Sequence, residues 1–143
     1  MEYKNIVVAV DGSEASEKAF KKSLAIAKRN NDARLILAHV VDSRTFATAE
    51  AYDRTLAERA DEYAKELLDT YVDNAKGAGV DDLVRCVEYG SPKVKIAKDI
   101  AKQFEADLII CGATGMNAVE RFLIGSVSEN ITRYATCDVL VVR

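Results

Sequence analysis

Apolar and polar positions divide the chain into alternating strand-like and helix-like segments. Continuous apolar runs predict five strands, over residues 6–10, 35–41, 83–89, 107–111 and 139–142. Between them, apolar residues recur at helical steps of three or four, as at Ala19, Phe20, Leu24 and Ala27. Continuous rather than alternating strand runs are typical of a parallel sheet covered on both faces. The expected fold class is therefore α/β.

Glycine, proline and polar residues between the apolar segments predict where the helices begin and end. Asp11-Gly12-Ser13 precedes a helix over 14–30, and Gly77-Ala78-Gly79 ends a long helix that starts near Tyr52. Ser91 and Pro92 are typical of an N-cap and first helical position, and a last helix is expected over 127–134. A doubly wound sheet of order 3-2-1-4-5 would bring the loops after the first and fourth strands to one crevice, where such sheets bind ligands.

Size and charge exclude several classes of protein. At 143 residues, a single domain over 1–143 is expected, and a net charge of −3 argues against a general nucleic-acid binder. No apolar stretch approaches the roughly 18 residues of a membrane span. The N-terminus shows no signal-peptide pattern, so a cytoplasmic location is expected. Cys86, Cys111 and Cys137 lack metal or disulfide spacing and are expected to act as small buried hydrophobes.

The most specific motif lies near the C-terminus. Gly112, Gly115, Gly125 and Ser126 form a Gly-x2-Gly-x9-Gly-Ser pattern between the fourth strand and the last helix. Glycine lets the backbone approach a ligand, and free N–H groups at a helix start point toward an anion. The pattern therefore predicts a phosphate-binding loop. It is not a Walker A loop, because no Gly-Lys-Ser/Thr follows.

This glycine spacing resembles the nucleotide-binding branch of the universal stress protein family. The resemblance covers essentially the whole chain, through segments 6–13, 37–41, 90–92, 106–110 and 139–142; Asp138 departs from it, standing where proline is common in the family. It implies a Rossmann-like doubly wound five-stranded parallel sheet, with helices on both faces, that binds ATP. It also implies a homodimer.

The resemblance further implies roles for individual residues. Asp11 would contact the adenosine end of ATP, and the backbone of Val40 would contact adenine. The ribose and phosphates would be lined by Gly112, Gly115, Gly125, Ser126 and Val127, with Ser128 as a further phosphate contact through its hydroxyl and N–H. Mg²⁺ would be held mainly by the phosphates, without a protein metal site.

Structural roles compete with several of these assignments. Asp11 and Glu14 form an Asp-x-x-Glu helix-start signature, so Asp11 could act as the cap of the first helix. Ser126 and Ser128 could be helix caps only. His39 is expected to be a hydrogen-bonded core histidine, and the tyrosines of the long helix are expected to pack rather than recognise a ligand.

The sequence shows no signature of a catalytic centre. No Gly-x-Ser-x-Gly elbow surrounds Ser126, and no lysine follows the glycine loop. The expected function is that of an ATP-binding stress-response or regulatory protein with little or no hydrolysis, in which nucleotide occupancy alters conformation or the binding of a downstream protein partner. A slow ATPase or phosphotransfer enzyme and a non-nucleotide dimeric interaction module are the alternatives.

The last strand, Val139 to Val142, predicts an interface. It would lie at an apolar sheet edge, which is an aggregation hazard unless covered. Antiparallel pairing of this strand with its copy would cover the edge with two-fold symmetry. A homodimer through this strand is therefore expected, with coverage by a helix of the same chain as the alternative.

Overall fold

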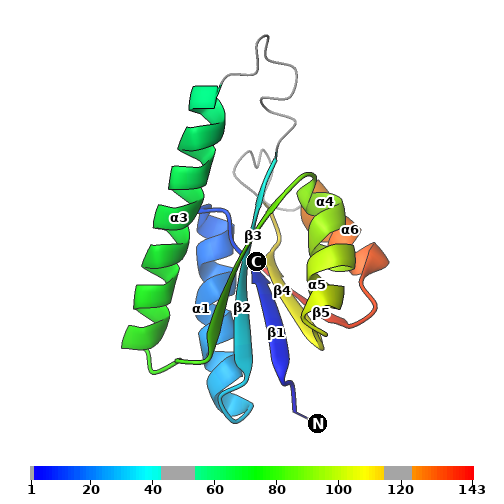
Figure 1. The fold of residues 1–143 in the computed structure, drawn as a ribbon. Coiled ribbons are helices and arrows are strands. Elements are labelled where there is room, and N and C mark those ends of the chain that lie inside the picture. The colour runs from blue at the N-terminus through cyan, green and yellow to red at the C-terminus, as the bar shows by residue number, and fades with distance from the viewer. Residues whose placement is uncertain (1, 43–53, 115–123) are drawn as a thin grey trace.

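The five strands form one parallel sheet. The computed structural model describes residues 2–42, 54–114 and 124–143. In it, the strand order is β3-β2-β1-β4-β5, which confirms the predicted order and α/β class (Figure 1). The strands are β1 (Asn5–Ala9), β2 (Arg34–Val41), β3 (Leu83–Tyr89), β4 (Leu108–Gly112) and β5 (Asp138–Val142). Both ends of each strand lie within one residue of the predicted bounds.

Helices cover both faces of this sheet (Figure 1). α1 (Glu14–Arg29) and α3 (Arg54–Gly77) lie on one face. The other face carries α6 (Ser126–Tyr134) and a second helical run, made of α4 (Pro92–Val94), η1 (Lys95–Ile100) and α5 (Ala101–Gln103). No helix within the described ranges is long and apolar enough to cross a membrane.

Alternate residues of β1 supply the two layers of the core. Ile6 and Val8 pack toward α1 and α3, whereas Val7 packs toward η1 and α6, and all three are fully buried. Two-sided burial explains why β1 reads as an unbroken apolar run. On the α1 side, the rings of Phe20 and Tyr71 meet edge to face, with centroids 4.5 Å apart.

The helical run over 92–103 differs from the regular helix that its apolar spacing predicts. Residues Lys95–Ile100 form a π-helical turn, in which the N–H of Ala101 donates to the carbonyl of Ile96. This wider turn buries Ile96, Ala97, Ile100 and Ala101 against the sheet. A period of 3.6 residues cannot distinguish such a turn from an α-helix, because both place residues four apart on one side.

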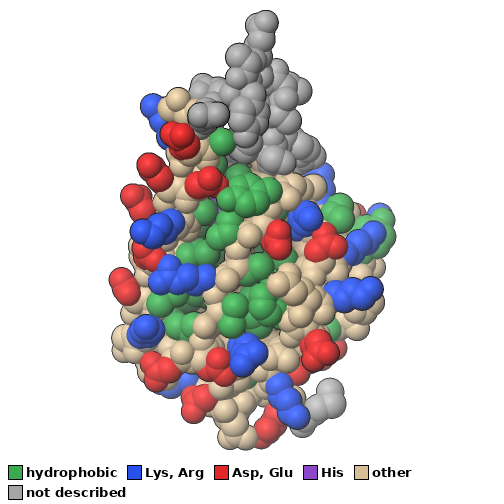
Figure 2. Space-filling model, viewed as in Figure 1, with side chains coloured by type: hydrophobic (Ala, Val, Ile, Leu, Met, Phe, Trp, Pro, Cys, Tyr) green, Lys and Arg blue, Asp and Glu red, His purple; other side chains and the backbone are tan. Residues whose placement is uncertain are grey.

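The sheet has two open edges, β3 and β5. Figure 2 looks onto the β3 edge, where a band of hydrophobic side chains runs between rows of charged residues. On the opposite edge, Val139, Leu140, Val141 and Val142 of β5 are all half-buried. Both edges therefore expose apolar side chains in the monomer.

We predict that core truncation on the η1 face is costly. Ile100→Ala removes a side chain that is fully buried, and we expect unfolding free energy to fall by about 2–5 kcal/mol. Val94→Ala, at a side chain 47% exposed on the same helical run, is the control and should change it by less than about 0.5 kcal/mol. Urea unfolding followed by circular dichroism measures both; equal losses would contradict the assignment of this core.

Candidate functional site

Three strands end in one row at the point where the strand order reverses. Ala9 of β1 is in register with Ala38 of β2, and Val8 of β1 with Ile110 of β4. Continuing these registers by two and three residues aligns Asp11 with Val40 and Ala113. The chain winds outward from β1 through β2 and β3, then returns to place β4 on the other side of β1. Asp11 and Gly112 therefore flank the switch point at which doubly wound sheets bind ligands.

The turn after β1 orients the Asp11 carboxylate. Gly12 has φ +82°, a conformation that glycine adopts without strain. Asp11 Oδ1 accepts a hydrogen bond of 2.8 Å from the N–H of Ser13. Ser13, not Asp11, is the N-cap of α1, because its Oγ accepts from the N–H of Ser16 at 3.1 Å. The interpretation of Asp11 as the helix cap is therefore wrong.

Gly112 is needed for close packing of β4 against α1. A Cβ at this position would lie 2.7 Å from the carbonyl carbon and the Cβ of Ala15. Real Cβ atoms essentially never come so close, and the backbone of Ala15 cannot move aside as a flexible side chain would. The glycine thus lets the start of α1 lie next to the end of β4. Dinucleotide-binding folds also use a glycine to allow close packing of a helix against a strand.

The N-terminus of α6 lies at the same edge of the sheet. Gly125 is its N-cap in extended conformation, and the N–H of Gly125 donates to the carbonyl of Ala113 at 2.6 Å. The first bond along the helix runs from the N–H of Glu129 to the carbonyl of Gly125. Among the described residues, no side chain caps this end. The N–H groups of Ser126, Val127 and Ser128 therefore form a donor set of the kind that binds anions.

The side chains of this first turn have different surroundings. The Ser128 hydroxyl is buried and donates to the carbonyls of Ala113, at 2.9 Å, and Gly125, at 3.0 Å. These bonds connect α6 to the end of β4. Because the hydroxyl is already engaged, only the N–H of Ser128 is available to a ligand. Val127 packs on the core layer between the sheet and η1, whereas the side chain of Ser126 is exposed.

The structure thus brings most of the predicted site residues to one edge of the sheet. They are Asp11, Val40, Gly112, Gly125, Ser126, Val127 and Ser128. The predicted contact Gly115 lies outside the described residues.

Other candidates for chemistry at this edge have structural roles. His39 is buried and its Nδ1 lies 2.9 Å from the carbonyl oxygen of Val10, as expected for a core histidine. Burial raises the pKa of Cys86 and of Cys111 to about 11, so neither thiol is an activated nucleophile. In the described ranges, no three His, Cys, Asp or Glu side chains are grouped to hold a metal ion. The arrangement is suited to holding an anion with neutral donors.

One residue at this edge was missed by sequence reasoning. Tyr63 of α3 donates from its hydroxyl to the carbonyl oxygen of Asp11 at 3.1 Å, across 52 residues of sequence. Its ring lies 6.0 Å from that of His39, and its side chain is 45% exposed. Its position on the apolar stripe of a helix is no different from that of a packing residue, so the sequence carries no signal of this contact.

Fold and site together define a doubly wound α/β domain in which a helix N-terminus, without a side-chain cap among the described residues, lies at the switch point of the sheet. The chain belongs to the universal stress protein family, whose model matches residues 2–143. Universal stress proteins of Staphylococcus aureus are 52% identical over 141 residues, covering 99% of this chain and 84% of theirs. The structure of universal stress protein UspA from Lactobacillus plantarum is similar, with a TM-score of 0.88, 36% identity and coverage of 100% and 99%. A universal stress protein in complex with cAMP matches at a TM-score of 0.72 and 30% identity, with coverage of 100% and 98%.

We predict that Gly112→Ala destabilises the protein even without a ligand. The added Cβ would push α1 away from β4, and overpacking of this kind costs about 1–3 kcal/mol. Gly77→Ala, which would meet no atom within 4 Å at the end of α3, is the matched control and should be neutral or stabilising by about 0.5–1 kcal/mol. Chemical unfolding of both variants is the measurement, and an unchanged stability of Gly112→Ala would refute the packing role.

Proposed function

We propose that this protein binds ATP at the carboxyl edge of the sheet and acts as a regulatory protein whose nucleotide occupancy changes conformation or the binding of a protein partner. The observation that carries the proposal is the N-terminus of α6, which has no side-chain cap among the described residues and is tied to β4 beside the switch point. The N–H groups of its first turn, which make no hydrogen bond within the helix, and the positive end of the helix dipole favour a phosphate group.

The neighbouring residues suit the rest of an adenine nucleotide. Asp11 lies across the switch point from Gly112, where its carboxylate can accept hydrogen bonds from ribose hydroxyls. Val40 lies in the next strand of the same row, where backbone groups can contact adenine. The family member solved with cAMP, at 30% identity, supports an adenine nucleotide as the ligand class.

The donor set favours binding over hydrolysis. Phosphoryl transfer depends on groups that stabilise developing charge and orient the attacking water. At the described positions, the phosphate would meet neutral backbone N–H groups, and the Asp11 carboxylate is already bonded to the N–H of Ser13. Mg²⁺, when bound with ATP, would neutralise phosphate charge and would be held mainly by the phosphate oxygens. We therefore expect slow turnover at most.

We also propose a homodimer through β5. The carbonyl of Val142 accepts from the N–H of Ala113, so its backbone groups point toward β4. Because backbone direction alternates along a strand, the N–H and carbonyl groups of Val139 and Val141 point outward, where a second copy of β5 can pair with them. Such pairing would also cover the half-buried valine side chains of this edge.

We predict that Ser126→Glu abolishes tight ATP binding without loss of stability. A carboxylate at the first position of α6 interacts favourably with the helix dipole but repels and displaces phosphate. We expect at least a roughly tenfold rise in Kd for Mg-ATP, or about 1.4 kcal/mol, by isothermal titration calorimetry. Ser126→Gln is the control, because Gln is neutral and has the same size as Glu. This variant should retain most of the affinity for Mg-ATP.

The outcomes separate the candidate functions. Equal affinity in the wild type and Ser126→Glu would place the phosphate elsewhere. No ATP binding by the wild type at millimolar nucleotide would favour the interaction module. Steady release of phosphate above the buffer rate, lost in Ser126→Glu, would favour the slow ATPase.

For the dimer, we predict that Val141→Pro shifts the protein to monomer. Proline removes the outward N–H of Val141 and obstructs pairing at that edge, while the inward ladder to β4 remains. Val141→Ala keeps the N–H and is the matched control, expected to stay dimeric. Light scattering coupled to size exclusion gives the mass of each. A dimeric Val141→Pro, or a monomeric wild type, would rule out this interface.

A further inference from the structure

We infer that Tyr63 is a positioning residue for the nucleotide site, which sets the place of Asp11 and connects that site to helix α3. The inference rests on the proposed function, because it concerns how the same site is held. It extends that function by identifying the element through which occupancy of the site and the position of α3 would affect each other.

The first observation is the bond on the carbonyl side of Asp11. The Tyr63 hydroxyl donates to the Asp11 carbonyl oxygen at 3.1 Å. It also lies directly over Gly12, because a Cβ there would be 2.4 Å from the Tyr63 hydroxyl oxygen. The turn that carries Asp11 therefore has a glycine both for its positive φ and for the close approach of this tyrosine.

The second observation is a bond on the amide side of the same residue. The N–H of Asp11 donates to Ser16 Oγ at 3.2 Å, and Ser16 Oγ lies 3.0 Å from the hydroxyl of Tyr71. Tyr71 belongs to α3, is 2% exposed, and burial raises its pKa, so its hydroxyl stays protonated. Both peptide groups of Asp11 are thus connected to α3, directly through Tyr63 and by way of Ser16 through Tyr71.

The two tyrosines differ in what else they do. Tyr71 packs on Phe20 in the core, and its loss would destabilise the fold. Tyr63 is 45% exposed and contacts the ring of His39, which comes just before the predicted adenine contact Val40. It therefore spans the ends of β1 and β2 at the protein surface, where its main role is to hold the turn that carries Asp11.

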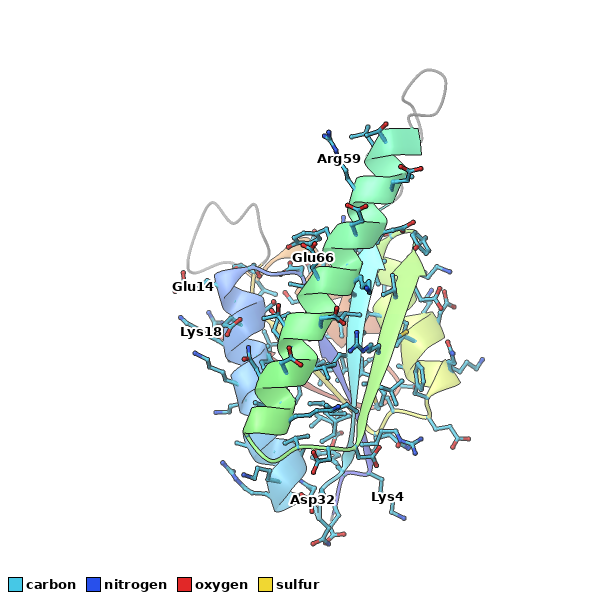
Figure 3. The ribbon with its side chains drawn as sticks, turned by 60° about the vertical axis from the view of Figure 1, so that its left-hand side comes forward. Lys4, Glu14, Lys18, Asp32, Arg59 and Glu66 are labelled. Carbon is cyan, nitrogen blue, oxygen red and sulfur yellow. The ribbon has the colours of Figure 1, made fainter. Side chains whose placement is uncertain are left out.

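Helix α3 extends this connection beyond the site. Its first turns rise past the carboxyl ends of the strands (Figure 1), and Figure 3 shows Arg59 on these turns above the level of Glu14, where α1 begins. Coupling between two sites is reciprocal. If Tyr63 positions Asp11 for the nucleotide, a partner that binds this end of α3 and changes nucleotide affinity must have its own affinity changed by the same factor when the nucleotide binds.

The test measures Mg-ATP affinity by calorimetry for the wild type, Tyr63→Phe and Tyr89→Phe. Tyr89 is the matched control because it also bonds α3 through one exposed hydroxyl, to Asp61 Oδ1 at 2.5 Å, but does not contact the Asp11 turn. Loss of a single hydrogen bond should raise Kd roughly three- to tenfold in Tyr63→Phe. Tyr89→Phe should stay within about twofold, and both should unfold at similar temperatures without nucleotide.

A second measurement distinguishes positioning from a general structural role. Asp11→Asn removes the carboxylate charge that Tyr63 is inferred to position, and the double variant Asp11→Asn/Tyr63→Phe completes a cycle. If Tyr63 acts through Asp11, its effect should largely disappear in the Asp11→Asn background. Additive effects would mean that Tyr63 acts independently of the Asp11 side chain and would overturn the inference.

The remaining outcomes separate this inference from the proposed function. ATP binding by the wild type that is weakened by Asp11→Asn but unchanged by Tyr63→Phe would refute the inference alone. Binding unaffected by Asp11→Asn would remove Asp11 from the site, and the inference with it. Absence of ATP binding by the wild type would refute both.

Discussion

Burial of β1 on both faces is the constraint on which the rest of the structure depends. Ile6, Val7 and Val8 have no exposed surface, so helices must cover the sheet from both sides. A chain that winds outward from this strand in one direction has to return to it before winding in the other. That return places the ends of β1 and β4 side by side, so the place of a ligand site follows from how the core is covered.

The close approach at Gly112 converts this topology into a specific site. Because no Cβ separates β4 from Ala15, the start of α1 and the end of β4 lie together. The bonds from Gly125 and Ser128 to Ala113 then bring the first turn of α6 to the same edge. The buried Ser128 hydroxyl stabilises the turn from inside, while the helix N–H groups of that turn form its donor set. Glycines and serines of one motif thus do different work: some allow close packing, and others supply donors.

The contacts of α3 suggest how such a site can regulate as well as bind. A helix N-terminus that binds phosphate but has no contacts with other elements cannot transmit ligand binding to the rest of a protein. Here the residue opposite it, Asp11, is bonded to α3 through Tyr63 and through Ser16 and Tyr71. In the proposed function, the exposed end of α3 and the edge strand β5 are the surfaces for a second protein and a second copy, respectively.

The sequence by itself determined the fold class and the order of elements, and it predicted the region of the candidate site. Continuous apolar runs predicted the five parallel strands, because strands buried on both faces require apolar residues. Glycine spacing indicated the end of β4, because close approach of the backbone requires glycine. Only the tertiary structure decided that Ser13 rather than Asp11 caps α1, that Gly112 is required by Ala15, and that Tyr63 reaches Asp11. It also decided that residues 95–100 form a π-helical turn. Local patterns record which side of an element is buried, whereas these contacts join residues far apart in the chain or depend on fine backbone geometry, and neither is encoded in periodicity.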